Sequence, residues 1–577
     1  MLLENISSPK DVKCLNNNDL NILCSEIRNT LINRVSKTGG HFGPNLGVVE
    51  LTTALHYVFN SPNDKMVYDT SHQTYVHKML TGRKNAFINE ENYSDVTGFS
   101  TQHESEHDFF ILGHTSTSIS LAYGLAKSRD MKNDSENVIA IIGDGSLSGG
   151  QAFEALSVGG KLDSNFIVIV NDNDISIGDN YGSIYDNLRL LRESNGEYHN
   201  NFFESLGYEY TYVEEGNNVL ELIEVFKSIK DRKCPMVIHV NTVKGLGYLD
   251  SEINKEKYHY ISPFNLETNE LNFKPTENYV SITNDYLCEK VSKNKNIIGI
   301  TPGTPGLFSK FRNEHPNNFL DVGIAEQTAV SIASSMASNG IRPVVSLFSS
   351  FSQRAYDQFS QDLAINNNPS ITLIFNNGIN KSAETHLGVF DISLLSNIPN
   401  IVFMCPTSKE EYLSMLDFSI NQTKYPIIIR IPRILFNEEC TDTNFEINKF
   451  KKTIEGEKIC VIGLGAFYKL GKEVVNKLKE ENINASLINP RFASGIDEIM
   501  LKKLEENHDL VITLEDGILD GGFGEKITRF YGDKNMKVLN FGATKEFVDN
   551  VSLDELYEKY NLKEDLIVKK IKESLNN

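Results

Sequence analysis

The chain has 577 residues, a hydrophobic fraction of 40 %, a charged fraction of 23 % and a formal net charge of −21. This composition excludes global disorder. Such a negative surface repels nucleic-acid phosphate and anionic lipid, and we therefore expect no nucleic-acid and no membrane partner.

The longest apolar runs hold about five residues, whereas a membrane helix needs about 20. Polar residues interrupt the N-terminus before a signal-peptide core can form, and the seven cysteines form no CxxC pair, so we expect a cytoplasmic protein with buried thiols.

The chain divides into three blocks in which β-type apolar runs alternate with helical patterns. The first block, residues 1–262, has its strand-like runs at residues 138–142, 166–170 and 236–240. The second block, residues 275–438, has them at residues 297–300, 319–322, 344–347, 371–375, 401–404 and 427–430. The third block, residues 453–577, has them at residues 459–463, 485–488, 510–514 and 538–541. The polar stretches 262–274 and 437–452 are typical of linkers.

Continuous valine and isoleucine runs are typical of parallel strands that are covered on both faces. The pattern therefore predicts an α/β protein with three domains, each built on a mostly parallel sheet.

The strongest local motif lies at the ends of two predicted strands. The run at 138–142 continues into Gly143-Asp144-Gly145-Ser146, and the run at 166–170 continues into Asn171-Asp172-Asn173. The carboxyl edge of a parallel sheet is where open α/β folds bind ligands. Asp144 and Asn173 offer the hard oxygen ligands that suit Mg²⁺, and the glycines let backbone N–H groups approach a diphosphate. A Gly-Asp-Gly alone is also an ordinary tight turn, but its spacing from the Asn-x-Asn favours a metal–diphosphate site.

The same spacing resembles the signature of thiamin-diphosphate enzymes. In the second block, Asp321-Val322-Gly323-Ile324-Ala325-Glu326-Gln327 looks like their glutamate motif, and this order of domains is transketolase-like. Further stretches are similar to the 1-deoxy-D-xylulose-5-phosphate synthase family: Gly39-Gly40-His41-Phe42, Ser71-His72-Gln73, Gly113-His114-Thr115-Ser116, Lys244-Gly245-Leu246-Gly247-Tyr248, Gln353-Arg354-Ala355-Tyr356 and Thr385-His386. The resemblance covers nearly the whole chain.

The resemblance implies roles for individual residues. Asp144, Asn173 and the Ile175 carbonyl would bind Mg²⁺. Thiamin diphosphate would be bound by His72, Gly113, His114, Thr115, Gly145, Ser146, Asn173, Tyr248, Glu326, Phe351 and Arg354, with Phe351 stacked on the aminopyrimidine ring. Glu326 would be the activating carboxylate, a proton-transfer role that suits a partly buried group, although a glutamate at a helix N-terminus is also favoured by the dipole. His41, His72, His259 and His386 would donate and accept protons near the reacting carbons, while any one histidine taken alone is more often structural.

Departures from the family lie on the acceptor side. Phe348 stands where the family usually has Tyr, and Asn376 where it has Arg. Both positions are associated with the substrate's phosphate, for which Arg433 remains.

The resemblance implies the decarboxylating condensation of pyruvate with glyceraldehyde 3-phosphate, in isoprenoid and thiamin biosynthesis, by a homodimer. Two alternatives stay open: a carboligase of the same fold with another aldehyde acceptor or a ketose donor, and a catalytically silent paralogue. The retained Asp144, Asn173, Glu326 and His386 argue against the silent paralogue.

Overall fold

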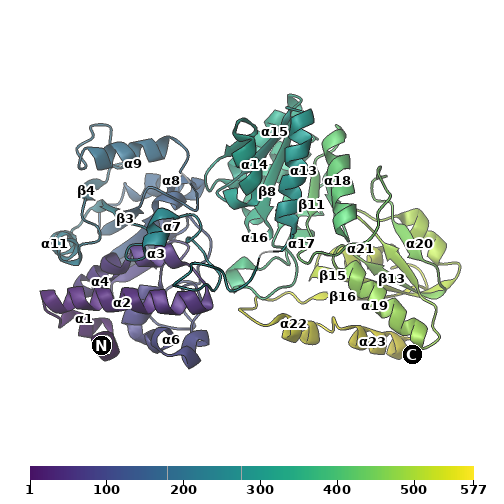
Figure 1. Ribbon diagram of the computed structural model, residues 1–577, viewed down its shortest axis with the longest axis horizontal. Coiled ribbons are helices and arrows are strands. Elements are labelled where there is room, and N and C mark those ends of the chain that lie inside the picture. The colour runs from purple at the N-terminus through teal and green to yellow at the C-terminus, as the bar shows by residue number, and fades with distance from the viewer. Residues whose placement is uncertain (179, 275, 577) are drawn as a thin grey trace. The chain divides into compact units, whose positions relative to one another are not determined.

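The computed structural model describes residues 1–178, 180–274 and 276–576. Pro275, the first residue of the second predicted domain, and Asn577, the last residue of the third, lie outside the described residues. The chain forms two compact units, one made of Met1–Pro275 with Gly323–Ala325 and the other of Thr276–Val322 with Glu326–Asn577 (Figure 1). Within the described ranges, every helix is too short or too polar to cross a membrane.

The first unit is built on a parallel five-stranded sheet in the order β1-β2-β3-β5-β4. Its strands are β1 (Lys65–Tyr68), β2 (Val138–Gly143), β3 (Phe166–Asp172), β4 (Glu209–Val213) and β5 (Pro235–Asn241). Alternate residues of a strand point to opposite faces. Ile139 and Ile141 accordingly join one apolar cluster, while Val138 and Ala140 join another on the opposite face.

Helices cover both faces of this sheet. α2 (Asn17–Thr38), α4 (Val49–Val58) and α11 (Val219–Ile229) supply one cluster, and α7 (Ser118–Lys132), α8 (Gly150–Gly159) and α9 (Ser183–Glu193) supply the other. The remaining helices are α1 (Pro9–Lys13), α3 (Phe42–Gly47), α5 (Tyr75–Lys78), α6 (Asn85–Ile88), α10 (Phe202–Ser205) and α12 (Leu249–Ile253), with short 3₁₀ or π turns at Leu3–Asn5, Met79–Arg83, Glu90–Asp95 and Asp144–Ser148.

The stretch 262–274, which its composition predicts to be a linker, instead packs on this unit. Phe264 is buried, its ring lies 5.6 Å from that of Phe42, and its backbone N–H donates to the Ser36 carbonyl at 2.8 Å. A bridge between Phe264 and Leu271 folds the segment back on itself. One buried aromatic ring therefore outweighs the polar composition around it.

The second unit contains two sheets. The first has the order β10-β11-β9-β8-β6-β7 and is parallel throughout. Its strands are β6 (Ile297–Thr301), β7 (Phe319–Asp321), β8 (Arg342–Phe348), β9 (Ile371–Phe375), β10 (Val402–Met404) and β11 (Ile427–Arg430). Its helices are α13 (Tyr279–Lys293), α14 (Ser309–Glu314), α15 (Glu326–Ser338), α16 (Ser349–Ser352), α17 (Asp391–Leu395) and α18 (Lys409–Asn421), with turns at Pro305–Phe308, Pro316–Asn318, Gln353–Ala355, Gln358–Ala364 and Glu384–His386.

The second sheet of this unit has the order β12-β14-β13-β15-β16, in which only β12 is antiparallel among the described strands. Its strands are β12 (Lys451–Ile454), β13 (Lys458–Gly463), β14 (Ser486–Asn489), β15 (His508–Ile518) and β16 (Lys537–Ala543), and its helices are α19 (Phe467–Glu480), α20 (Glu498–Leu504), α21 (Phe523–Phe530), α22 (Leu553–Lys559) and α23 (Glu564–Asn576). One apolar cluster joins the two sheets, with Phe403 from the first and Ile488 from the second. The division into three domains stays a prediction.

The α/β class with mostly parallel sheets is confirmed. The strands that the apolar runs do not predict are β1, β4 and β12, and each lies at the edge of its sheet. An edge strand has a neighbour on one side only, and β4 and β12 are only partly buried along most of their length. Such strands lack the continuous apolar run that reveals a central one.

Candidate active site

The carboxyl ends of β2 and β3 carry two of the three predicted metal ligands, Asp144 and Asn173. Asp144 follows β2 directly, is buried, and accepts a hydrogen bond from Asn180 Nδ2 at 2.8 Å. Asn173 follows β3, and its Oδ1 atom is buried without a hydrogen-bond partner in the described part of the chain. A buried carboxylate and an unsatisfied amide oxygen fit the oxygen ligands that Mg²⁺ takes. The role of the Ile175 carbonyl stays a prediction.

Gly145 is needed where it stands. A Cβ atom there would lie 2.4 Å from Ser176 Oγ, and Ser176 follows Ile175 in the segment that carries Asn173. A larger residue would displace that segment, so the glycine permits the close approach of the two loops.

The pKa values of the two aspartates at this sheet edge, Asp144 and Asp172, shift in opposite directions. Burial and the neighbouring Asp172 carboxylate raise the pKa of Asp144 to about 7. Burial also acts to raise the pKa of Asp172, but His239, whose Nε2 lies 2.8 Å away, and the ion pair with Arg192 hold it below its ordinary value. Asp172 is thus already compensated and also accepts the Asp174 N–H at 3.0 Å. Asp144 is the carboxylate that a bound cation would stabilise.

Two loops with strained backbone, one after β1 and one before α7, lead to the residues predicted to bind the diphosphate. Thr70, Ser71 and Ser116 have φ values of 56°, 62° and 70°, a region that side chains with a Cβ rarely occupy. Asp69 holds the loop before α7 by accepting the N–H groups of Ser116 at 2.8 Å and Ser118 at 3.0 Å.

That loop contains Gly113, His114 and Thr115 and ends where α7 begins. The hydroxyl of Ser116 donates to the Ser146 carbonyl at 2.7 Å, which joins the loop to the Gly145–Ser146 turn. The two predicted diphosphate-binding segments therefore lie together. The strain is typical of functional sites, and Asp69, which organises it, was not predicted from the sequence.

Three predicted histidines form one cluster in the first unit. The ring of His41 lies 5.0 Å from that of His72 and 5.8 Å from that of His259, and the rings of His72 and His259 are stacked at 5.4 Å. Desolvation and the Lys244 charge lower the pKa of His72 to about 3 and that of His259 well below its ordinary value. Both rings are therefore neutral near pH 7. His72 Nδ1 is buried and has no hydrogen bond within the described ranges.

Lys244 fixes the orientation of His259. Its side chain is 2 % exposed, and its ammonium group donates to the Ser176 carbonyl at 2.5 Å and lies 3.1 Å from His259 Nδ1. An ammonium group can only donate, so Nδ1 accepts and the ring proton lies on Nε2. Burial lowers the pKa of Lys244 to about 8, which leaves the group mostly charged at pH 7. The sequence marks Lys244 only by its place in the Lys-Gly-Leu-Gly-Tyr stretch and indicates no role for it.

Tyr248 lies among aromatic side chains rather than in this cluster. Its ring contacts those of Phe42, Tyr258 and Phe264, and its hydroxyl donates to Asn269. Its contact with the cofactor stays a prediction.

The second unit holds the predicted glutamate. Glu326 is the first residue of α15, is 3 % exposed, and has an Oε2 atom with no hydrogen bond to the described residues. Arg354 Nη1 lies 3.7 Å from that atom. Burial raises the pKa of Glu326, and Arg354 opposes the rise. A buried carboxylate with one oxygen that makes no hydrogen bond is suited to exchanging a proton with a bound group.

Two rings contact Phe351, the predicted stacking residue of the second unit. Phe351 belongs to α16, one turn before Arg354, and its ring lies 5.7 Å from that of His386 and 5.5 Å from that of Phe348. The Thr385 hydroxyl lies 2.9 Å from His386 Nδ1. These contacts place His386 beside the predicted stacking ring.

The acceptor-side residues share one edge of the six-stranded sheet. Phe348 ends β8, Asn376 follows β9, and Arg433 lies three residues beyond the end of β11. Because β9 pairs with both β8 and β11, these three positions lie at neighbouring strand ends. Asn376 and Arg433 are exposed. Of the two arginine positions that the resemblance associates with the substrate's phosphate, Arg433 is retained and position 376 is an asparagine.

The second unit matches two transketolase-type family models. Residues 278–438 match the family model described as the transketolase pyrimidine-binding domain, and residues 448–567 match the transketolase C-terminal domain. With the parallel sheets and the strand-end site, these matches define the class as transketolase-like. Residues 3–200 match the model described as 1-deoxy-D-xylulose-5-phosphate synthase.

Relatives with that name align over nearly the whole chain. The 1-deoxy-D-xylulose-5-phosphate synthase of Caldanaerobacter subterraneus subsp. tengcongensis is 39 % identical over 97 % of this chain and 97 % of its own length. That of Alkaliphilus oremlandii is 38 % identical over 100 % of this chain and 99 % of its own length. The chain belongs to the 1-deoxy-D-xylulose-5-phosphate synthase family. The solved transketolase of Campylobacter jejuni covers 96 % of this chain at 17 % identity and a TM-score of 0.43, too distant to add to that assignment.

Proposed function

We propose that the chain condenses pyruvate with glyceraldehyde 3-phosphate, releasing CO₂ and forming 1-deoxy-D-xylulose 5-phosphate, with thiamin diphosphate and Mg²⁺ as cofactors. Family membership supports the reaction. The observation that carries it in this chain is Glu326, a buried carboxylate with one oxygen left open beside Arg354. When bound, thiamin diphosphate supplies the carbanion chemistry that releases CO₂ from a 2-oxo acid and forms a bond to an aldehyde.

The chain's own residues would divide the remaining work. Asp144 and the unsatisfied Oδ1 of Asn173 would hold Mg²⁺, and the segment from Gly113 to Thr115 would offer its N–H groups to the diphosphate. Glu326 would hold a proton at its open oxygen. His259, with its proton on Nε2, would donate to a substrate oxygen. His72 Nδ1, which has no hydrogen bond among the described residues, would form one with a bound group.

Glyceraldehyde 3-phosphate is the proposed acceptor, with its phosphate near Arg433. We also propose that the active enzyme is a cytoplasmic homodimer and that its product serves isoprenoid and thiamin biosynthesis. The runner-up is a carboligase of the same fold that prefers an unphosphorylated aldehyde, because Asn376 and Phe348 leave Arg433 as the remaining expected phosphate ligand at that sheet edge.

The test is CO₂ release from pyruvate by the purified chain with both cofactors, in the absence of an aldehyde, with glyceraldehyde 3-phosphate and with D-glyceraldehyde. The proposal expects rapid release only with glyceraldehyde 3-phosphate. Equal release with D-glyceraldehyde would favour the runner-up. Release that needs no aldehyde, or no release at all, would contradict both.

A further inference from the structure

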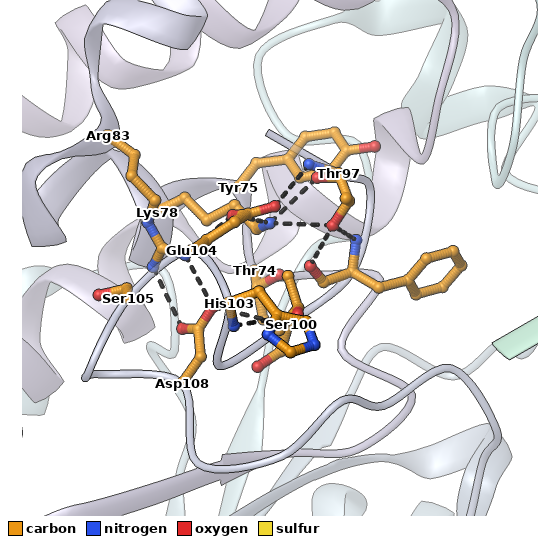
Figure 2. Close-up of polar contacts among 12 residues, drawn as sticks. Thr74, Tyr75, Lys78, Arg83, Thr97, Ser100, His103, Glu104, Ser105 and Asp108 are labelled. Carbon is orange, nitrogen blue, oxygen red and sulfur yellow. Dashed lines mark hydrogen bonds and ion pairs between the residues drawn. The ribbon is translucent and has the colours of Figure 1, made fainter. Parts of the chain in front are cut away.

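The first unit contains a buried cluster of four charged side chains that the mechanism does not use. It consists of Lys78, Arg83, Glu104 and Asp108, and Figure 2 shows its contacts. The side chains of Lys78 and Asp108 are 0 % exposed, that of Arg83 10 % and that of Glu104 12 %. Replacing buried ion pairs by apolar residues is often neutral or stabilising, so such a cluster is weak evidence for stability alone. The cluster is better explained by the loop that its hydrogen bonds hold in place.

The cluster clamps one loop, residues 97–108, onto α5 and the turn that follows it. Glu104 Oε2 accepts from Lys78 Nζ at 2.6 Å and from Arg83 Nη1 at 3.0 Å, while its Oε1 accepts the Thr97 N–H at 2.7 Å. Lys78 Nζ also donates to the Thr97 carbonyl at 3.1 Å. At the far end, Asp108 accepts two hydrogen bonds from Arg83, at 2.7 and 3.1 Å. Both backbone groups of Thr97 are therefore held by charged partners.

The clamped end of the loop leads directly to two of the candidate catalytic histidines. The Thr97 hydroxyl donates to the Phe99 carbonyl at 2.8 Å, and the Phe99 ring lies 5.7 Å from the His41 ring. The next residue, Ser100, donates its N–H to Ser71 Oγ at 2.8 Å. Ser71 has a φ of 62° and immediately precedes His72. A continuous chain of contacts thus runs from the Glu104 carboxylate to His41 and His72.

We propose that Glu104 is a positioning residue for His41, acting through Thr97 and Phe99. The inference rests on the proposed function for its kinetic part only. None of the contacts described above joins Glu104 directly to either histidine. Its carboxylate fixes where the loop lies, and the loop fixes the ring against which His41 packs.

The decisive substitutions are Glu104→Gln, Phe99→Leu and the two combined, with Glu106→Gln as the control. Glu106 lies two residues from Glu104 on the same loop and is exposed. Glutamine keeps the shape of the side chain and removes the charge that Lys78 and Arg83 bind. Leucine at position 99 leaves the four charges in place and removes the aromatic contact with His41.

Displacement of a catalytic group by about 1 Å can lower a rate by about a hundredfold. We expect Glu104→Gln and Phe99→Leu each to lower kcat about ten- to a hundredfold, with KM for pyruvate changed less than about twofold and thiamin diphosphate still bound. If Glu104 acts through Phe99, the combined variant loses no more than the slower single variant. The control keeps the wild-type kcat. Wild-type kcat in Phe99→Leu, or losses that multiply in the combined variant, would overturn the proposal.

A second measurement does not depend on turnover. Amide hydrogen exchange of the full chain without cofactor should become faster at Thr97 and Ser100 in Glu104→Gln, and stay unchanged in Glu106→Gln. Unchanged exchange in Glu104→Gln would also overturn the proposal. A wild-type chain that does not turn over pyruvate would instead refute the proposed function, and the exchange result would still decide whether Glu104 holds the loop.

Discussion

Replacement of Lys244 by methionine should make the protein more stable and less active. Burial lowers the pKa of Lys244 from 10.5 to about 8. One pKa unit corresponds to about 1.4 kcal/mol, so holding this charge costs the folded state up to about 3 kcal/mol at pH 7. Because the pKa in the folded state is depressed, the cost is fully present below pH 8 and disappears as the pH rises toward 10.5. Methionine removes the charge and keeps most of the length of the side chain.

The loss of activity has a different origin. Methionine cannot donate to His259 Nδ1 or to the Ser176 carbonyl, so the His259 proton is no longer held on Nε2. Hydrogen bonds from charged groups contribute about 1.5–3 kcal/mol. At about 1.4 kcal/mol per factor of ten, kcat/KM should fall about ten- to a hundredfold.

The assay combines thermal unfolding at pH 7 with CO₂ release from pyruvate, and Lys257→Met serves as the control because Lys257 is exposed. We expect Lys244→Met to raise Tm and lower kcat/KM, and Lys257→Met to change neither. A lower Tm together with wild-type kcat/KM would refute the reasoning on both counts. Wild-type kcat/KM alone would show that Lys244 does not orient His259.

Three further predictions concern the metal, the glutamate and the acceptor. Because burial and Asp172 raise the pKa of Asp144 to about 7, Mg²⁺ affinity measured by calorimetry should be nearly constant above pH 7 and fall about tenfold per pH unit below it. Asp144→Ala should abolish the Mg²⁺-dependent binding of thiamin diphosphate. A Mg²⁺ affinity that does not depend on pH would remove Asp144 from the site. Glu326→Gln should still bind the cofactor but slow proton exchange at its reactive carbon by orders of magnitude, and normal exchange by NMR would show that the motif has been misread. Asn376→Arg should raise kcat/KM for glyceraldehyde 3-phosphate over D-glyceraldehyde about ten- to a hundredfold, and no rise would mean that position 376 does not set acceptor specificity.

The sequence predicts the centre of each sheet better than its edges. β2 and β3 are buried along nearly all of their length and appear as uninterrupted apolar runs. β4, with the sequence Glu-Tyr-Thr-Tyr-Val, lies at an edge and carries no such run. Composition also fails for residues 262–274, where one buried phenylalanine decides the packing.

In the site as well, residues within local motifs can be predicted from the sequence, and residues that act through distant loops cannot. Asp144, Asn173 and Glu326 stand at strand or helix ends within recognisable motifs, so the sequence predicts them. Lys244 is 68 residues from Ser176, and Asp69 acts through the N–H groups of Ser116 and Ser118, which lie 47 and 49 residues away. Such roles depend on which loops the fold brings together, and no local pattern specifies that.

The proposed function can be tested most directly by identifying the product. Pyruvate labelled with ¹³C at its carbonyl carbon is mixed with glyceraldehyde 3-phosphate, thiamin diphosphate, Mg²⁺ and the purified chain, and the products are followed by ¹³C NMR. The account predicts that the label appears at the ketone carbon of 1-deoxy-D-xylulose 5-phosphate, with one CO₂ released per product, and that Glu326→Gln forms almost none. Label in acetaldehyde or in a product that lacks the carbons of glyceraldehyde 3-phosphate would contradict it.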